Sequence, residues 1–157
     1  MSGPRQPILG IHVDEYEGHA WISFTNIIGE TTTYGLWASS YARNHGYDPD
    51  RFRSGDDIWM NLERHFSIGA SRYYELTPAQ RLQFYRFLYT GHDYYIAWYN
   101  CASFAENCVA TVIGEDVDAD SWFGIETPAE LMESIEELEE DDPTGHLAPS
   151  KIKICEK

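Results

Sequence analysis

The chain has 157 residues, of which 43% are hydrophobic and 15% aromatic, enough for one domain with a substantial core. Its formal net charge of −15, from 26 acidic and 11 basic residues, argues against a general nucleic-acid-binding protein, since such proteins need a basic surface for phosphates. The N-terminus lacks the apolar core of a secretory signal, and no apolar run approaches the roughly 18 residues of a membrane span. We therefore expect synthesis in the cytoplasm, no nucleic-acid partner and no membrane span.

The cysteine pattern predicts neither a disulfide framework nor a metal site. Cys101, Cys108 and Cys155 form an odd and sparse set, and no CxxC pair or histidine-cysteine cluster has zinc-site spacing. Residues 116–120 copy the opening of a calcium loop, but the glycine and glutamate needed at its sixth and twelfth positions are missing, which favours a solvated acidic loop. No glycine-rich phosphate loop is present either. We expect no metal and no cofactor.

The N-terminal part of the chain predicts β-structure. From His19 the pattern alternates, so His19, Trp21 and Ser23 share one face of a strand and the apolar residues between them share the other. Residues 8–13 are a short apolar strand, 26–30 a hairpin connection, and 31–37 a β-branched and aromatic return strand.

The middle of the chain is less regular. Residues 38–55 are polar without a sustained period, which indicates an excursion loop that could form a wall of a site. Residues 58–62 alternate and residues 71–76 are rich in strand-forming side chains, so we expect a second pair of strands.

Three helices are predicted in the second half. Thr77 and Pro78 start a helix that reaches Tyr89 or Thr90, and its core-facing stripe is drawn from Leu82, Tyr85, Phe87, Leu88 and Tyr89. The next helix runs from Cys101 to about Ile113, with one apolar face: Cys101, Phe104, Ala105, Cys108, Val109 and Val112.

The third helix follows Thr127-Pro128-Ala129-Glu130, which has the spacing of a capping box. Residues 136–142 place like charges near its C-terminus, where they oppose the helix dipole, so we expect fraying there. We assign residues 1–142 to a single domain and 143–157 to a C-terminal tail.

Cys101 is the candidate nucleophile, because a thiolate is favoured at a helix N-terminus and beside an imidazole such as that of His19. From spacing alone, a buried core cysteine is the more common interpretation of Cys101. Cys108 and Cys155 are weaker candidates, and five other histidines are available as bases: His12, His45, His65, His92 and His146.

Three segments together resemble the circularly permuted NlpC-type branch of papain-like cysteine hydrolases: residues 18–24 (GHAWISF), 33–37 (TYGLW) and 99–105 (YNCASFA). In that branch a histidine on an early strand precedes the cysteine that begins a helix. The resemblance covers about residues 8–140. It implies an α+β, papain-like (permuted NlpC-type) fold, with an antiparallel sheet packed against helices and the nucleophile at a helix N-terminus.

The resemblance implies that Cys101 is the nucleophile and His19 the base. The third catalytic member, which orients the histidine, is then Thr33 or Ser39, or an acid among Asp14, Asp56 and Asp57; the sequence leaves this open. Further residues are expected to support the oxyanion or line the pocket: Tyr99, Asn100, Trp21, Tyr34 and Trp37.

More narrowly, the chain is similar to small bacterial amidase effectors that type VI secretion systems deliver against peptidoglycan. This implies a peptidoglycan peptide as substrate, a cognate immunity protein and a secretion-apparatus component as partners, and action in the periplasm of a target cell. Two alternatives stay open: an acyltransferase or deamidase acting on a host lipid or protein, and a catalytically inactive binding module of the same fold.

Overall fold

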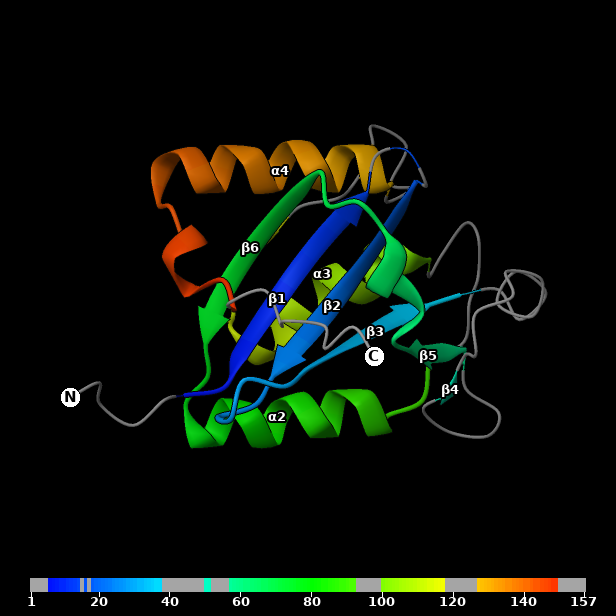
Figure 1. Cartoon of the computed structure of the whole chain (residues 1–157), viewed down its shortest axis with the longest axis vertical. Coiled ribbons are helices and arrows are strands. Elements are labelled where there is room, and N and C mark those ends of the chain that lie inside the picture. The colour runs from blue at the N-terminus through cyan, green and yellow to red at the C-terminus, as the bar shows by residue number, and fades with distance from the viewer. Residues whose placement is uncertain are drawn as a thin grey trace, which may run out of the picture.

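The computed structural model describes residues 6–14, 16, 18–37, 50–51, 57–92, 100–117 and 127–149. Within these ranges the chain is an α+β domain with one antiparallel sheet and three α-helices (Figure 1). The strands are β1 Ile8–Asp14, β2 His19–Thr25, β3 Thr31–Leu36, β4 Asp50–Arg51, β5 Ile58–Met60 and β6 Ala70–Glu75. The α-helices are α2 Pro78–Tyr89, α3 Cys101–Val112 and α4 Pro128–Asp141, and two short 3₁₀ helices are η1 Leu62–His65 and η2 Gly145–Leu147.

The order of the strands in the sheet is β4-β5-β3-β2-β1-β6, with the long β1–β2 hairpin at its centre. The predicted strands at 8–13, 19–24 and 31–37 are confirmed. The predicted pairing between the strands near residues 58–62 and 71–76 is wrong, because β5 pairs with β3 and β6 pairs with β1. These two strands therefore extend opposite sides of the same sheet.

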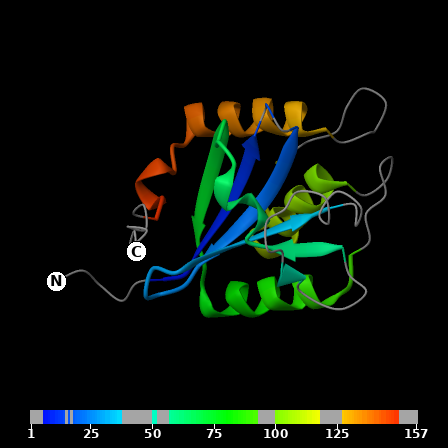
Figure 2. The same cartoon turned by 45° about the vertical axis from the view of Figure 1, so that its right-hand side comes forward.

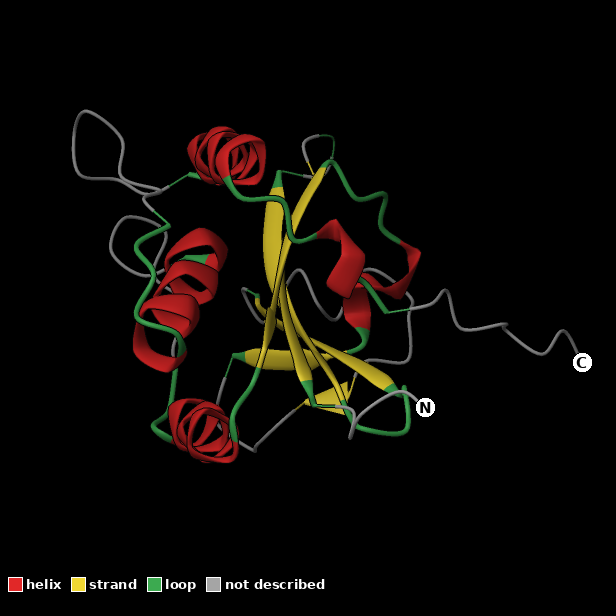
Figure 3. Ribbon diagram, turned by 90° about the vertical axis from the view of Figure 1, so that its left-hand side faces the viewer, coloured by secondary structure: helices red, strands yellow, loops and turns green. Residues whose placement is uncertain are grey.

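The three α-helices cover one face of the sheet, and the 3₁₀ helices lie on the other (Figure 3). Figure 2 shows α2 and α4 toward opposite ends of the sheet with α3 between them. The alternation predicted for β2 is confirmed: Ala20, Ile22 and Phe24 join the core under the helices, which places His19 and Trp21 on the opposite face. The largest fully buried side chains of this core include Phe84, Phe104, Leu9, Ile11, Leu131 and Ile135.

Helix α2 begins as predicted, with the Thr77 hydroxyl accepting a hydrogen bond from the Gln80 backbone N–H. Its predicted core stripe is partly wrong. Phe84, Phe87 and Leu88 are buried, whereas Leu82 and Tyr89 are 53% and 59% exposed. The stripe is shifted because the side of α2 that carries Phe84 faces the sheet. The Phe84 ring stacks there on the Phe24 ring, with 5.0 Å between the ring centroids.

Helix α4 starts after Thr127, whose hydroxyl accepts from the Glu130 N–H, and it continues to Asp141. The chain after Pro143, expected to be a tail, contacts β6: the Tyr73 backbone N–H donates to the Thr144 hydroxyl at 2.9 Å. In the described part of the chain, none of the helices has the length and apolar character needed to cross a membrane.

Candidate active site

Cys101 is the first residue of α3, and Asn100 before it caps the helix together with Ser103. The Asn100 Oδ1 accepts from the backbone N–H groups of Ala102 and Ser103, at 3.0 and 3.1 Å, while the Ser103 hydroxyl accepts from the Asn100 N–H. This fixes the first turn of α3, which is buried against the sheet and leaves Cys101 only 7% exposed. The thiol therefore lies at the positive end of a rigid helix.

His19 lies where the sheet opens. β2 pairs with β3 only from Ile22 to Thr25, so the first three residues of β2 pair with β1 alone. Tyr34 pairs with both β2 and β5, Gly35 and Leu36 pair with β5 alone, and Figure 1 shows β3 diverging from β2. The start of β2 is thus free of a β3 neighbour, which gives the N-terminus of α3 access to His19.

The His19 imidazole and the Cys101 thiol interact with each other, and their pKa values move in opposite directions. Burial alone would lower the pKa of His19, but hydrogen bonds to Cys101 and Glu63 raise it to about 9. Burial alone would raise the pKa of Cys101, but the hydrogen bond and charge of His19, with the backbone amides of Ala20 and Ala102, lower it. The pair therefore favours a thiolate beside an imidazolium.

Glu63, on η1, holds the other side of the histidine ring. Its Oε1 lies 3.0 Å from the His19 Nε2 and 2.8 Å from the Trp37 Nε1, and its Oε2 accepts from the Thr33 hydroxyl at 2.7 Å. An indole N–H can only donate, so Oε1 is an acceptor and the His19 Nε2 donates to it. This contact occupies Nε2, so Nδ1 is the ring nitrogen that remains for the thiol.

Two backbone features position Glu63. Asn61 adopts a left-handed conformation (φ 60°), its N–H donates to the Thr33 carbonyl at 2.9 Å, and the turn brings η1 back over β3. Gly35 supplies the space: a Cβ there would lie 1.8 Å from the Glu63 Oε1. The side chain of Glu63 is 0% exposed, so its oxygens depend on these donors in place of water.

Three aromatic rings surround the His19 imidazole. The distance between ring centroids is 3.7 Å from His19 to Trp37 and 5.7 Å from His19 to Trp21, which stacks almost parallel. Phe66 meets the imidazole edge-on, with 5.8 Å between the centroids. Indole faces attract cations, so this environment is compatible with a protonated His19.

The predicted pocket residues that the structure describes lie in three different environments. Trp21 and Trp37 contact His19 as described, whereas Tyr34 points to the opposite face and packs on Phe84, where burial raises its pKa to about 12. Tyr34 follows Thr33 on β3, so alternation alone excludes it from the site. Asn100, the last of these pocket residues, uses its Oδ1 to cap α3.

The third-member prediction missed Glu63. Thr33 donates to Glu63 rather than to His19, so it is one contact further from the ring. Asp14 is the register partner of His19 and accepts from the Tyr16 N–H, and Asp57 bonds through its backbone to Trp37 and His92. Three other predicted residues lie outside the described ranges: Tyr99, Ser39 and Asp56.

The other cysteines and histidines have different surroundings. Cys108 is buried in the core, which raises its pKa and keeps it a neutral thiol. His92 lies 2.6 Å from the Phe87 carbonyl oxygen at the end of α2, and His146 is exposed on η2. The described residues include no group of three or more His, Cys, Asp or Glu placed to hold a metal ion. Cys155, His45 and the side chain of His65 are outside the described part.

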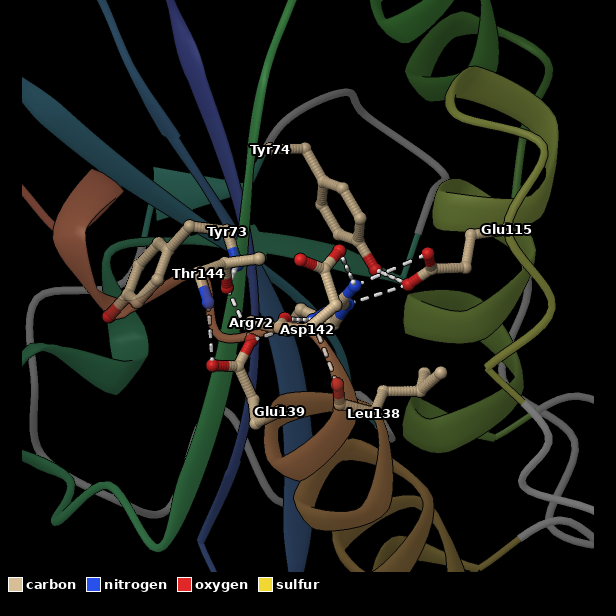
Figure 4. A network of polar contacts seen from close by, with 8 residues as sticks. All are labelled: Arg72, Tyr73, Tyr74, Glu115, Leu138, Glu139, Asp142 and Thr144. Atoms are coloured by element: carbon tan, nitrogen blue, oxygen red, sulfur yellow. Dashed lines mark hydrogen bonds and ion pairs between the residues drawn. The ribbon is translucent and has the colours of Figure 1, made fainter.

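A second buried polar cluster is centred on Arg72 of β6 (Figure 4). Its guanidinium donates to the carboxylates of Glu115 and Glu139 at 2.6 and 2.9 Å, and to the Asp142 carbonyl at 2.7 Å. The Tyr74 hydroxyl donates to Glu115, and the Thr144 hydroxyl donates to Glu139. Arg72 thereby satisfies carbonyls and acids at the end of α4, which explains why the predicted fraying before Asp141 is wrong.

Comparisons of the chain with protein-family models, curated protein sequences and solved structures find no match.

Proposed function

We propose that the chain is a cysteine hydrolase that cleaves amide bonds, with Cys101 as nucleophile, His19 as general base and acid, and Glu63 as the group that orients His19. The observation that carries this proposal is the arrangement of three side chains at the N-terminus of α3: the Cys101 thiol interacts with His19, and the His19 Nε2 lies 3.0 Å from the Glu63 Oε1. A nucleophile, a base within hydrogen-bond reach and a third group on the base are the parts that acyl transfer requires.

The proposed reaction has two steps. The Cys101 thiolate attacks the carbonyl carbon of an amide, and the C–N bond breaks as the His19 imidazolium gives its proton to the leaving nitrogen. This leaves a thioester on Cys101. Water then attacks the thioester after losing a proton to His19, which releases the acid and restores the thiolate-imidazolium pair. The N–H of Cys101 has no carbonyl four residues earlier within α3, so it is the backbone donor we assign to the oxyanion.

We further propose that the fold is of the circularly permuted, NlpC-type papain-like class and that the substrate is a peptide of bacterial peptidoglycan. The antiparallel sheet, the early-strand histidine and the cysteine that opens α3 support this class together with the sequence resemblance. Action as a secreted antibacterial effector in the periplasm of a target cell follows from the same resemblance. The net charge of −15 supports an immunity protein that docks through a basic surface.

The test is digestion of purified peptidoglycan, with the products identified by mass. The wild-type chain should release peptides with a new amine and a new carboxylate, and both Cys101→Ala and His19→Ala should abolish this. His146→Ala, which removes an exposed histidine, is the matched control and should digest normally. Cleavage by Cys101→Ala would overturn the mechanism. Intact peptidoglycan after exposure to the wild-type chain, with Cys101 still reactive, would overturn only the substrate.

A further inference from the structure

A second histidine, His12, lies on the same sheet face as His19. It belongs to β1 and is 4% exposed, and Trp21 lies between the two histidine rings. The His12 ring is stacked on the Trp21 ring at 5.5 Å and 28°, and Trp21 is stacked on His19 at 5.7 Å and 11°. The Trp21 indole therefore stacks on both imidazoles, that of His12 and that of His19.

His12 is fixed by contacts to both of its ring nitrogens. Nδ1 lies 2.6 Å from the Ser71 hydroxyl of β6, and Nε2 lies 2.7 Å from the Ser23 hydroxyl of β2. Gly10 makes room for this contact, since a Cβ there would lie 2.5 Å from the Ser23 Oγ and 2.6 Å from the His12 Nε2. Three strands thus converge to hold one ring that has no contact with the thiol.

The two histidines have opposite protonation behaviour. Burial lowers the pKa of His12 to about 3, whereas the pKa of His19 is raised to about 9. A neutral ring beneath Trp21 adds no positive charge that would compete with the His19 imidazolium. The charged and titratable side chains beside the two rings are Tyr73 of β6, Asp14 of β1, Cys101 of α3 and Glu63 of η1.

We propose that His12 is a positioning residue of the active site, which acts through Trp21 to hold the His19 ring in line with Cys101. This inference rests on the proposed function, since it assigns a support to the same thiol-imidazole pair. The ring of His12 is the part that acts, and the two serine hydroxyls serve to orient that ring.

Two substitutions separate the ring from its hydrogen bonds. His12→Gln keeps polar contacts to Ser23 and Ser71 but removes the ring under Trp21. His12→Phe keeps a ring under Trp21 but removes the hydrogen bonds. His146→Gln is the matched control on an exposed histidine. The measurement is the rate of alkylation of Cys101 by iodoacetamide as a function of pH, read from the mass of the peptide that carries Cys101.

We expect His12→Gln to lower the alkylation rate at neutral pH by roughly 10-fold, with the thiol titrating at higher pH, because each unit by which the thiol pKa rises above the working pH lowers the thiolate fraction about tenfold. His12→Phe and His146→Gln should keep the wild-type profile. A folded His12→Gln with an unchanged profile, or a His12→Phe that shifts as far as His12→Gln, would overturn the inference. If the wild-type Cys101 itself titrates as an ordinary thiol, the proposed function fails instead.

Discussion

The molecule buries two ionic centres, and they are built in opposite ways. Glu63 has a fully buried side chain that accepts hydrogen bonds from three side chains, and Arg72 has a 3% exposed side chain that donates to carboxylates and carbonyls. Both buried side chains have hydrogen-bonding partners, as the burial of a charge requires. The two centres differ in whether a neighbouring pair of side chains is suited to exchange a proton.

The pKa shifts of Arg72 and of its two glutamate partners, Glu115 and Glu139, all favour the charged forms. Burial alone would lower the pKa of Arg72, but its hydrogen bonds to Glu115 and Glu139 raise it above the ordinary value. Burial would raise the pKa values of both acids, but their polar partners lower them. The cluster ties α4 and η2 to β6, and we interpret it as structural.

Around Glu63 the charges can move. Its partner His19 interacts with Cys101, and the pKa of the histidine is raised while that of the thiol is lowered. We interpret Glu63 as the acid that orients a base and the acids beside Arg72 as groups that stabilise the fold. The comparison therefore predicts that substitutions at the two centres change different measured quantities.

The largest effect is expected from Glu63→Gln. The glutamine would keep its oxygen on Trp37 and His19 and turn its amide nitrogen to Thr33, but it carries no charge to stabilise the His19 imidazolium. Amide cleavage should therefore fall roughly 10²- to 10³-fold, about 3–4 kcal/mol of transition-state stabilisation. The free energy of unfolding should change far less. Activity is read from the rate of peptide release, and Glu75→Gln on the exposed end of β6 is the control.

Gly35→Ala tests the same contact from the neighbouring strand. Its new Cβ would occupy the position of the Glu63 Oε1 and displace the carboxylate from His19. Activity should fall in the same direction as in Glu63→Gln, and Gly145→Ala, where a Cβ meets nothing within 4 Å, should leave it unchanged. Normal activity in a folded Gly35→Ala would argue against Glu63 as the orienting group.

The next effect is expected from Arg72→Met. Removing the cation leaves Glu115 and Glu139 without their partner, which costs about 3–5 kcal/mol for a buried pair. The lower end applies, because these carboxylates are 29% and 22% exposed. Urea denaturation measures the loss, and Arg86→Met on the exposed face of α2 is the control. A marked fall in activity per folded molecule would show that the two centres are coupled.

The smallest effect concerns acid stability. The pKa of His12 is about 3 when folded and near 6.5 when unfolded, so its stabilising contribution is complete above pH 6.5 and is lost as pH falls toward 3. At pH 5 the loss is about 2 kcal/mol. His19 acts in the opposite direction: its pKa is raised to about 9, so its stabilising contribution grows by about 1 kcal/mol between pH 7 and pH 5 as the unfolded histidine becomes protonated. His12→Phe retains this contribution, so the difference between the wild type and His12→Phe isolates His12. Urea denaturation at pH 7 and pH 5 should show this loss in the wild type relative to His12→Phe.

The sequence predicted the elements whose signals are local. The caps at Thr77 and Thr127, the alternation of β2 and the apolar face of α3 depend on neighbours within a few residues, so the positions of His19 and Cys101 followed from them. Their proximity could be inferred only from the resemblance, since 82 positions separate 19 from 101.

Glu63 could not be identified in the same way. It is one of 26 acids, and it reaches His19 only because β5 pairs with β3 and Asn61 turns the chain back. One signal was present: a glycine at position 35, inside a strand of β-branched and aromatic residues, marks a close approach by another group. Burial of Arg72 is equally non-local, because its partners come from the segment after α3 and from the C-terminal end of α4.

The most direct test of the central claim is the mass of the protein quenched in acid during turnover of soluble cross-linked peptides from peptidoglycan. The account predicts a population heavier by the acyl half of the cleaved amide, with the added mass on the peptide that carries Cys101. This species should be absent in Cys101→Ala and strongly reduced in Glu63→Gln. Efficient cleavage with no adduct on Cys101, or with equal rates in Cys101→Ala, would contradict the account.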